Sequence, residues 1–294
     1  MSVAVITIVR DRTEHLDNLL RGLASQTQLP DEVVVVVMGG PDPREQITDR
    51  DLPLTYVHLA VADVALPLAS ARNLGARTAQ ADHLIFLDVD CIPGAKLVRR
   101  YDEALHVVDG LLMGQVRYLE PGAAAGGWDE AALHRRSHPH QVRSAPRTRD
   151  HADEPISTDN YELFWSLSFG IRRETFWATL GGFDPRFDGY GGEDTDLAFT
   201  ARARGVCLAW LDSAVAYHQH HPTFSPPVQH LDSIVTNATA FRDKWGCWPM
   251  QGWLEAFHDL GLVSFVPEED HLQILRQPTD AELFAARRDE ISSA

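Results

Sequence analysis

The amino-acid sequence predicts an α/β protein with a mostly parallel sheet flanked by helices. Residues 3–9 and 32–37 are apolar, largely β-branched runs without polar alternation, which is typical of strands buried on both faces. Two further strand signals, at residues 54–59 and 83–87, are separated by a helical pattern. Strands that alternate with helices indicate parallel β-α-β units, and ligands of such doubly wound sheets bind at the carboxyl ends of the strands.

The first helix is predicted to begin directly after the first strand. Asp11 and Glu14 have the spacing of a capping box, with Asp11 as the N-cap residue. Its apolar face recurs with helical spacing at Leu16, Leu19, Leu20 and Leu23. A second helix is expected over residues 69–79, ahead of the strand at 83–87.

The middle of the chain, residues 120–160, has a different character. It contains several glycines and prolines, and its apolar periodicity is poor apart from a short helical signal at 128–133. Its arginines include Arg135, Arg136, Arg143, Arg147 and Arg149. A stretch of this length inside a compact protein is either a functional lid, which would become ordered when a ligand binds, or a disordered connection.

Regular structure is predicted again after residue 160. Strands are expected at 164–171, 206–211 and 214–218, and helices at 174–180 and 193–204. The chain after residue 222 is mostly helical in pattern, with amphipathic stretches at 229–244 and 280–288. Residues 223–294 are therefore expected to form a helical C-terminal extension.

Composition and charge narrow the classes of function. The chain has 294 residues, of which 44% are hydrophobic and 23% charged, as is ordinary for a soluble globular protein. A net charge of −16 repels polyanions and argues against nucleic acid as a partner. An anionic small substrate would need local compensation, which a divalent cation or a group of arginines could supply.

Membrane insertion and secretion are not expected either. The apolar stretch at residues 33–38 is far shorter than the roughly 18–20 residues that a membrane-spanning helix needs. The N-terminus reads as a strand, without the basic region and cleavage site of a signal peptide. The three cysteines, Cys91, Cys207 and Cys247, match no zinc or redox spacing, which favours reduced thiols and a cytoplasmic location.

Two carboxylates, Asp88 and Asp90, directly follow the strand expected at residues 83–87. Residues two apart on a strand face the same side, so both side chains can reach one cation at the strand end. A small number of carboxylate oxygens suits Mg²⁺ or Mn²⁺ that also holds substrate phosphates. A solvated turn is the alternative interpretation, but the position after a buried strand favours a metal site.

A second acidic pair, Glu193 and Asp194, follows a glycine-rich loop that contains Tyr190, Gly191 and Gly192. Glycines permit positive φ angles and a close approach of the backbone. A carboxylate at this place could accept a proton from an attacking hydroxyl. The helix dipole also favours acidic residues in a first turn, so a purely structural role stays open.

Histidine and arginine side chains supply further candidates. His218, His220 and His221 lie at the end of an expected strand, where neutral imidazoles can bind a metal. Neighbouring side chains point to opposite sides, and a polar surface cluster is the alternative. Arg72 lies in the helix before the acidic strand and could contact a phosphate, orient a carboxylate, or be an ordinary surface arginine.

Together these motifs resemble the family 2 glycosyltransferases, which have the nucleotide-sugar transferase fold called GT-A. The likeness covers residues 3–222 and rests on motifs that occur in the family's order. They are residues 6–12 (Ile-Thr-Ile-Val-Arg-Asp-Arg), 71–75 (Ala-Arg-Asn-Leu-Gly), 86–90 (Phe-Leu-Asp-Val-Asp), 181–184 (Gly-Gly-Phe-Asp) and 191–194 (Gly-Gly-Glu-Asp). The last two are similar to the acceptor-side motif of galactosyltransferase-like members.

The resemblance implies a donor site and a metal site. The donor-binding residues would be Thr7, Arg10, Arg72, Asp88 and Asp90. Asp90 is the second acid of the Asp-x-Asp (DXD) motif and would hold Mn²⁺ or Mg²⁺ on the donor diphosphate, with His218 as a further ligand. The metal would stabilise the charge of the leaving group.

The resemblance also implies an acceptor site. Tyr190, Gly191 and Gly192 would lie on the acceptor side, with Asp194 as the general base and Glu193 orienting the acceptor or sharing that role. Attack from the side opposite the departing diphosphate would invert the anomeric carbon. Residues 1–222 would then form the transferase domain. Its nucleotide-binding part would be residues 1–118, its flexible loop residues 120–160, and its acceptor-side part residues 161–222.

One departure from the family pattern concerns the donor. Family members commonly end the second strand with Val-Val-Asp-Asp-Gly-Ser, whereas residues 35–40 read Val-Val-Val-Met-Gly-Gly. The acid that usually reads the uracil edge is absent, which leaves the base of the nucleotide open. A UDP-sugar is still the expected donor, with Asp42 or backbone groups as substitutes for the missing acid. The Gln-x-x-Arg-Trp motif of processive synthases is also missing, which favours transfer of a single sugar to a hydroxyl acceptor.

Two other functions stay open. A catalytically silent nucleotide- or sugar-binding protein on the same scaffold would fit the missing aspartates, but the retained acidic pairs and His218 argue against it. A sugar nucleotidyltransferase usually has a glycine-rich loop after its first strand. Residues 10–13, Arg-Asp-Arg-Thr, contain no glycine, which disfavours that class.

Overall fold

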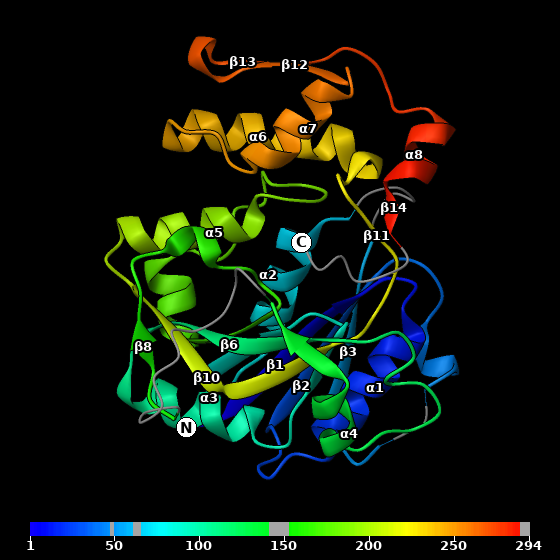
Figure 1. Cartoon of the computed structure of the whole chain (residues 1–294). Helices are drawn as coiled ribbons and strands as arrows, with labels where there is room; N and C mark the ends of the chain where they lie inside the picture. Colours follow the sequence, from blue (N-terminus) through cyan, green and yellow to red (C-terminus); the bar gives the residue numbers. More distant parts are fainter. Residues whose placement is uncertain (48–49, 61–65, 141–152, 289–294) are drawn as a thin grey trace.

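The computed structural model describes residues 1–47, 50–60, 66–140 and 153–288. In this part of the chain one large sheet has the strand order β3-β2-β1-β4-β9-β6-β10-β5 (Figure 1). Four strands at one side are parallel, namely β1 (Val3–Val9), β2 (Glu32–Met38), β3 (Leu54–Leu59) and β4 (His83–Leu87). They confirm the predicted β-α-β half of the chain.

The other half of the sheet is mixed. Its strands are β5 (Cys91–Pro93), β6 (Gly110–Leu119), β9 (Ser168–Arg172) and β10 (Cys207–His218), with the short β7 (Ser137–Pro139) and β8 (Ile156–Ser157) beside them. β9 runs antiparallel between β4 and β6, and β10 runs parallel to β6. The two short strands expected at 206–211 and 214–218 are one strand, because a register shift between Leu211 and Val215 interrupts the pairing without ending it.

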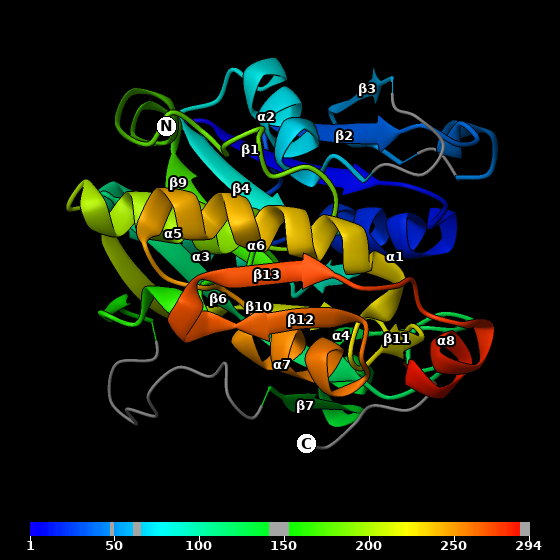
Figure 2. The same ribbon diagram turned by 90° about the horizontal axis from the view of Figure 1, so that it is seen from above.

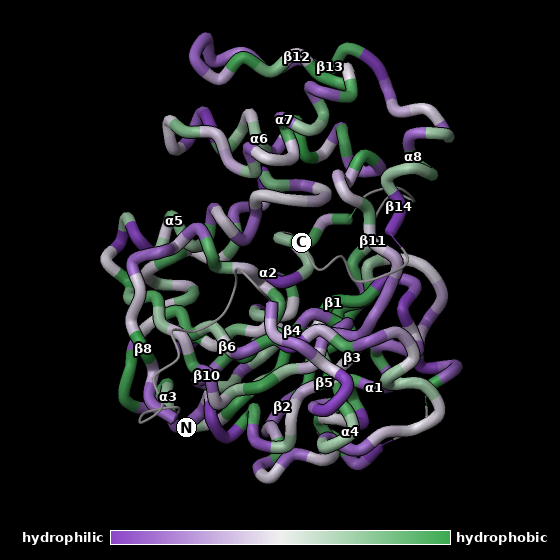
Figure 3. Tube along the Cα trace, viewed as in Figure 1, coloured by the Kyte–Doolittle hydropathy of each residue, from purple (hydrophilic) through white to green (hydrophobic). Residues whose placement is uncertain are grey.

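Helices cover both faces of the sheet. α1 (Thr13–Ala24) and α3 (Leu97–Val107) pack against one face, and α2 (Leu68–Thr78) and α5 (Glu193–Ala203) against the other. Alternate residues of the central strands enter the two cores, as Val3 and Val5 do on one side and Ala4 and Ile6 on the other. Hydrophobic stretches accordingly mark these strands in Figure 3.

The start of α1 differs from the prediction. Its N-cap residue is Arg12, which makes no side-chain cap hydrogen bond, so the capping box expected from Asp11 and Glu14 is wrong. Asp11 has a φ of 53°, a left-handed conformation that turns the chain at the end of β1. This turn leaves Arg12 free to contact Asp90, which lies beyond the end of β4.

Two other predicted elements change type. The strand expected at 164–171 is shorter and begins at Ser168, because Tyr161–Leu163 forms a 3-10 turn. The helix expected at 174–180 is a π-helix, Thr175–Thr179. In the segment 120–160, α4 (Glu130–Arg135) confirms the short helical signal, and Arg143, Arg147 and Arg149 lie outside the described residues.

The chain after residue 222 packs over α5 (Figures 1 and 2). Its helices are α6 (Leu231–Trp245), α7 (Gln251–Asp259) and α8 (Asp280–Ala286), with a 3-10 turn at Val228–His230. It also holds a hairpin of β12 (Val263–Val266) and β13 (His271–Ile274), and β11 (Thr223–Phe224) pairs with β14 (Arg287–Arg288). None of the helices in the described ranges has the length and apolar character required to cross a membrane.

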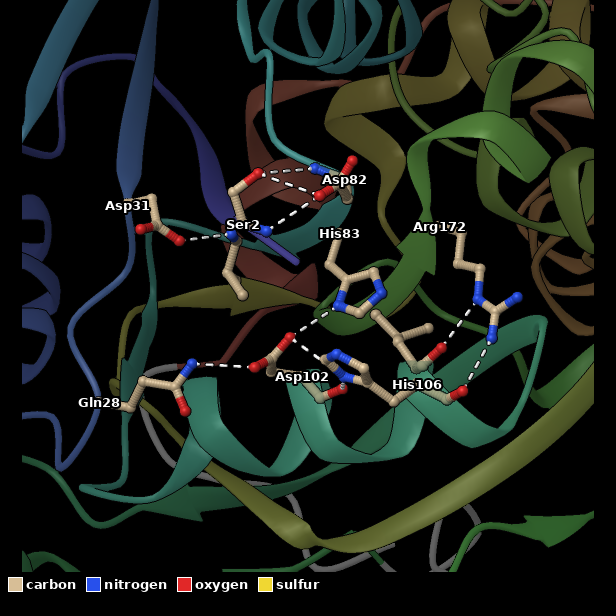
Figure 4. A network of polar contacts seen from close by, with 10 residues as sticks. Ser2, Gln28, Asp31, Asp82, His83, Asp102, His106 and Arg172 are labelled. Carbon is tan, nitrogen blue, oxygen red and sulfur yellow. Dashed lines mark hydrogen bonds and ion pairs between the residues drawn. The ribbon is translucent and has the colours of Figure 1, made fainter.

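A polar network ties α3 to the amino-terminal end of β4 (Figure 4). The buried His83, first residue of β4, donates from Nδ1 to Asp102 Oδ1 at 2.8 Å, and Gln28 donates to Asp102 Oδ2 at 3.0 Å. His106, one helical turn on, bonds from Nδ1 to the backbone oxygen of Asp102 at 2.7 Å. We call His83, Asp102 and His106 the amino-end cluster, since it lies at the sheet edge opposite to Asp88 and Asp90.

Candidate active site

The predicted acidic motif lies at the carboxyl end of β4. Asp88 N–H donates to Leu167 O at 3.0 Å, and Cys91 N–H donates to Asp88 O at 2.8 Å. These bonds close a turn that carries the chain from β4 into β5 and keeps both carboxylates at the sheet edge. The side chains of Asp88 and Asp90 are 27% and 13% exposed, so both carboxylates are partly buried at the protein surface.

Asp90 is surrounded by basic groups from two separate segments, the start of α1 and the chain after β10. Arg12, before α1, donates to Asp90 Oδ2. His221 Nε2 lies 3.4 Å from the same oxygen, and His15 Nε2 lies 3.8 Å from Oδ1. Asp90 Oδ1 is nevertheless buried without a hydrogen-bond partner among the described residues, which is costly for a carboxylate oxygen unless another group binds it.

The charge states at this place suit a metal ion. Burial alone would raise the pKa of Asp90, but His221, His218 and Arg12 hold it well below its usual range. Burial lowers the pKa of His218 to about 4, so this imidazole is neutral at physiological pH, as a metal ligand must be. Potential ligand atoms of Asp90, His218 and His221 lie within 4.8 Å of one another.

These three residues therefore form a donor set that fits a divalent cation. One carboxylate and two imidazoles suit Mn²⁺ better than Mg²⁺, because Mg²⁺ prefers oxygen ligands alone. The orphan oxygen of Asp90 is the observation that favours a missing ligand. We call Asp90, His218 and His221 the carboxyl-end cluster.

Arg72 connects the two acidic motifs. Its guanidinium donates to Asp88 Oδ1 at 2.9 Å and to Glu193 Oε1 at 3.0 Å, and its side chain is only 6% exposed. The structure thus identifies Arg72 as a residue that orients carboxylates. Burial of its charge is compensated by these two partners, which hold the ends of β4 and α5 together.

Glu193 and Asp194 are the first residues of α5, and Glu193 is buried while Asp194 is half-buried. Burial and the neighbouring Asp194 raise the pKa of Glu193 to about 7, against the opposing effect of Arg72. Burial also raises the pKa of Asp194. A carboxylate whose pKa is raised to about 7, as that of Glu193 is, is suited to accept and release protons.

The loop before α5 requires its glycines. Gly189, Gly191 and Gly192 have φ angles of 84°, 93° and 90°, which L-residues rarely adopt. Gly192 is the N-cap residue, so the predicted glycine-rich loop leads directly into the acidic first turn. Burial, together with Glu193 and Asp194, raises the pKa of Tyr190 to about 12 and keeps its hydroxyl protonated.

Other predicted residues lie further from these contacts. Thr7 is buried in the middle of β1, and within the described ranges its Oγ1 has no hydrogen-bond partner. Arg10 follows β1, with Nε 3.6 Å from Asp11. Asp42, the suggested substitute for base recognition, is hydrogen-bonded to Arg44 at 3.0 Å, and Met38 is 3% exposed. The roles of these residues stay predictions.

Sequence reasoning missed Arg12 and His15 as neighbours of Asp90, and it named His221 as a candidate metal ligand without assigning it to Asp90. Arg12 and His15 come from the start of α1, and no local spacing links them to Asp90. His221 lies in the same histidine-rich segment as His218. Its residue type indicated a possible metal ligand, but the sequence does not indicate that its side chain points toward Asp90. His218 and His221 approach each other, with ring centroids 5.3 Å apart, because the chain leaves β10 directly after His218.

Comparisons with known proteins identify two curated relatives of this chain. The chain is 29% identical over 266 residues to validoxylamine A glucosyltransferase of Streptomyces hygroscopicus subsp. limoneus, covering 80% of this chain and 56% of the relative. It is 28% identical over 247 residues to chondroitin synthase of Pasteurella multocida strain Pm70, covering 76% of this chain and 25% of the relative. The chain thus spans about half, or less, of the length of these relatives.

Solved structures share the fold. S. aureus TarS 1-349 in complex with UDP-GlcNAc aligns with a TM-score of 0.56 at 16% identity, covering 82% of this chain and 67% of that one. GalNAc-T7 with UDP, GalNAc and Mn²⁺ aligns with a TM-score of 0.53 at 14% identity, covering 88% and 57%. These likenesses confirm the predicted GT-A fold. The sequence profile of glycosyl transferase family 2 matches residues 4–171, more than half of the chain, and the protein therefore belongs to that family.

Proposed function

We propose that this protein is an inverting glycosyltransferase that moves one sugar from a nucleotide-sugar donor to an acceptor hydroxyl, with a divalent cation. The observation that carries the proposal is the bridge made by Arg72 between Asp88 and Glu193, at 2.9 and 3.0 Å. This bridge holds Asp88 and Glu193, which the proposal assigns to the donor and the acceptor side, close to each other. A transferase needs both substrates held in that proximity.

The carboxyl-end cluster would hold the cation. Asp90, His218 and His221 supply the ligands, and bound Mn²⁺ would neutralise charge on the diphosphate leaving group. Arg12, which contacts Asp90, is a second cation at the same place and can pair with a phosphate oxygen. Asp88, oriented by Arg72, is left to accept hydrogen bonds from the donor.

Asp194 is the proposed general base. Glu193 is engaged by Arg72, whereas Asp194 has no arginine partner within hydrogen-bond distance among the described residues. Asp194 takes the proton of the acceptor hydroxyl, the acceptor oxygen bonds to the anomeric carbon, and the bond from that carbon to the diphosphate oxygen breaks. The electron pair of that bond leaves with the nucleoside diphosphate, and the configuration inverts.

A UDP-sugar is the proposed donor. Support comes from the shared fold with TarS in complex with UDP-GlcNAc and with GalNAc-T7 bound to UDP, GalNAc and Mn²⁺. Met38 stands where the family commonly has an acid, and Asp42 already pairs with Arg44. Base recognition therefore falls to backbone groups in the proposal, and GDP- and dTDP-sugars belong in the test.

The test is release of nucleoside diphosphate from UDP-, GDP- and dTDP-sugars, with Mn²⁺ or with EDTA. We expect slow hydrolysis of one donor that EDTA abolishes. Binding without cleavage, even when acceptors are added, would instead favour a catalytically silent binding protein. Release of pyrophosphate from a nucleoside triphosphate and a sugar phosphate would identify a nucleotidyltransferase.

Replacement of Asp194 separates its role from donor binding. Asp194→Asn should bind the donor normally but lose transfer by about 100-fold or more, the usual contribution of a positioned base. Asp243→Asn, at an exposed position of α6, is the matched control and should transfer at the wild-type rate. Transfer by Asp194→Asn within about tenfold of wild type would show that another group takes the proton.

A further inference from the structure

Gln219 connects the stretches of chain that meet at the carboxyl-end cluster. It lies directly after β10, between His218 and His221. Its backbone N–H donates to Asp90 O at 2.6 Å, which continues the antiparallel pairing of β10 with β5 by one residue. Its side-chain Nε2 donates to His15 O at 3.0 Å. The stretch that carries the two histidines is therefore bonded to the turn of Asp90 and to the start of α1.

The other side of the same amide is also bonded. Gln219 Oε1 accepts from Asn18 Nδ2 at 2.9 Å, and Asn18 Oδ1 accepts from Trp128 Nε1 at 2.9 Å. Arg21 holds Trp128 in turn, since its guanidinium lies 4.7 Å from the centre of the indole ring and donates to Trp128 O at 2.8 Å. We call Trp128, Asn18 and Gln219 the amide network.

The direction of each bond in the amide network is fixed from both ends. The indole N–H of Trp128 can only donate, so Asn18 must present its oxygen to it and its amide nitrogen to Gln219. The backbone oxygen of His15 can only accept, so Gln219 must present its nitrogen there. Rotation of either amide by half a turn would place oxygen against oxygen and donor against donor. Gln219 is therefore held in one orientation.

These bonds join the two stretches that supply the candidate metal ligands. Asp90 comes from the turn between β4 and β5, whereas His218 and His221 come from the end of β10 and the chain after it. Gln219 is only 4% exposed, so water competes little for its bonds. Metal ligands depend on outer hydrogen-bond partners that orient them, and loss of such a partner weakens metal binding.

We propose that Gln219 is the positioning residue of the carboxyl-end cluster, which sets the place of Asp90 relative to His218 and His221 and thereby the affinity for Mn²⁺. It touches neither the ion nor a substrate and acts through the backbone oxygens of Asp90 and His15. The inference rests on the proposed function, to which the cation belongs.

The bond to His15 O extends this role to the charge beside Asp90. It holds the first turn of α1, and Arg12 contacts the carboxylate of Asp90 from the start of that helix. A purely structural role for Gln219 is the competing interpretation. In that case its replacement would lower the free energy of unfolding and leave the Mn²⁺ affinity of the folded protein unchanged.

The test measures Mn²⁺ binding to the whole chain by titration calorimetry, at a temperature where each variant is folded by circular dichroism. Gln219→Met keeps an unbranched side chain of similar length but leaves His15 O and Asn18 Nδ2 without their partner. It should raise the Kd for Mn²⁺ by about tenfold or more, the lower limit for outer partners of metal ligands. Gln229→Met is the matched control, since Gln229 is an exposed glutamine in the turn Val228–His230, and should bind Mn²⁺ as wild type does.

Donor hydrolysis gives a second readout. In Gln219→Met the Mn²⁺ concentration for half-maximal turnover should rise with the Kd, while the rate at saturating Mn²⁺ stays within about threefold of wild type. A rate that falls at every Mn²⁺ concentration, with an unchanged Kd, would show the purely structural role instead.

Each outcome decides the proposal. A Kd for Mn²⁺ in Gln219→Met within about twofold of wild type overturns it. If that variant is unfolded, Asn18→Leu, which removes the bond to Gln219 Oε1 and suits a helix, decides at the same threshold. Wild type that binds Mn²⁺ but turns over no donor overturns the proposed function, and calorimetry still decides the role of Gln219. Wild type that binds no Mn²⁺ overturns the metal site and this proposal together.

Discussion

The two ends of the central sheet carry clusters of the same composition, each with one aspartate and two histidines. Ligand atoms lie within 4.8 Å of one another in both. In the amino-end cluster both oxygens of Asp102 accept a hydrogen bond, from His83 and from Gln28. In the carboxyl-end cluster, Asp90 Oδ1 is buried and has no hydrogen-bond partner in the part of the chain that the structure describes.

This difference separates a structural cluster from a candidate binding site. Residue type and distance are alike at both ends, and each end has one buried atom without a hydrogen-bond partner among the described residues, His83 Nε2 and Asp90 Oδ1. Of these two atoms only Asp90 Oδ1 belongs to a charged group, whose burial costs more free energy unless a ligand binds it. The surroundings agree. The amino-end cluster ties α3 to β4 through His83 and to β9 through the backbone oxygen of His106, which accepts from Arg172. The carboxyl-end cluster adjoins the acids that Arg72 holds together.

Replacement at the carboxyl end should have the largest effect. Asp90→Asn removes a charged ligand and should lower Mn²⁺-dependent donor turnover by about 100-fold or more, while circular dichroism stays as in wild type. Calorimetric titration with Mn²⁺ should show the loss of binding directly. Turnover and Mn²⁺ binding at wild-type levels in this variant would remove Asp90 from the proposed metal site.

Replacement at the amino end should change stability and leave catalysis alone. Asp102→Asn weakens the bonds from His83 and Gln28 and should lower the free energy of unfolding by about 1–3 kcal/mol, the range for hydrogen bonds to charged groups. Urea unfolding measures this, and Mn²⁺ binding should be unaffected. Glu103→Gln, at a half-exposed neighbour on α3, is the control and should change stability by about 0.5 kcal/mol or less.

A loss of Mn²⁺ binding in Asp102→Asn would contradict the comparison. It would mean that the internally bonded cluster opens to take the ion, and that hydrogen-bond satisfaction does not distinguish the two ends.

The smallest expected effect is on pH dependence. Burial lowers the pKa of His83 below its ordinary value of 6.5, against the opposing effect of Asp102. The unfolded chain therefore binds more protons than the folded one as pH falls below 6.5, so stability decreases with acidification. Between pH 6.5 and 5.5 this residue can contribute at most about 1.4 kcal/mol, the value for one proton over one pH unit.

Urea unfolding of wild type and His83→Gln at both pH values measures this contribution. The variant should lose less stability on acidification than wild type does. An equal loss in the two proteins would show that His83 is not the group responsible.

Much of the fold could be predicted because its signals are local. The apolar runs at β1 and β2, and the leucine spacing of α1, record burial on both strand faces and on one helix face. The capping box failed because Asp11 and Glu14 have the right types at the right spacing, yet Asp11 takes a positive φ. Backbone conformation at a single residue depends on its tertiary neighbours and not on spacing alone.

By itself the sequence determined the parallel half of the sheet and the order of the acidic motifs, because hydrophobic periodicity and short motifs are written in consecutive residues. Only the tertiary structure decided which distant groups meet. It brought Arg12 and His221 to Asp90, Arg72 to Glu193, and the aromatic side chains of the C-terminal segment to Tyr190. Such contacts depend on how strands and helices pack, and no local pattern in the chain encodes the direction in which each side chain points.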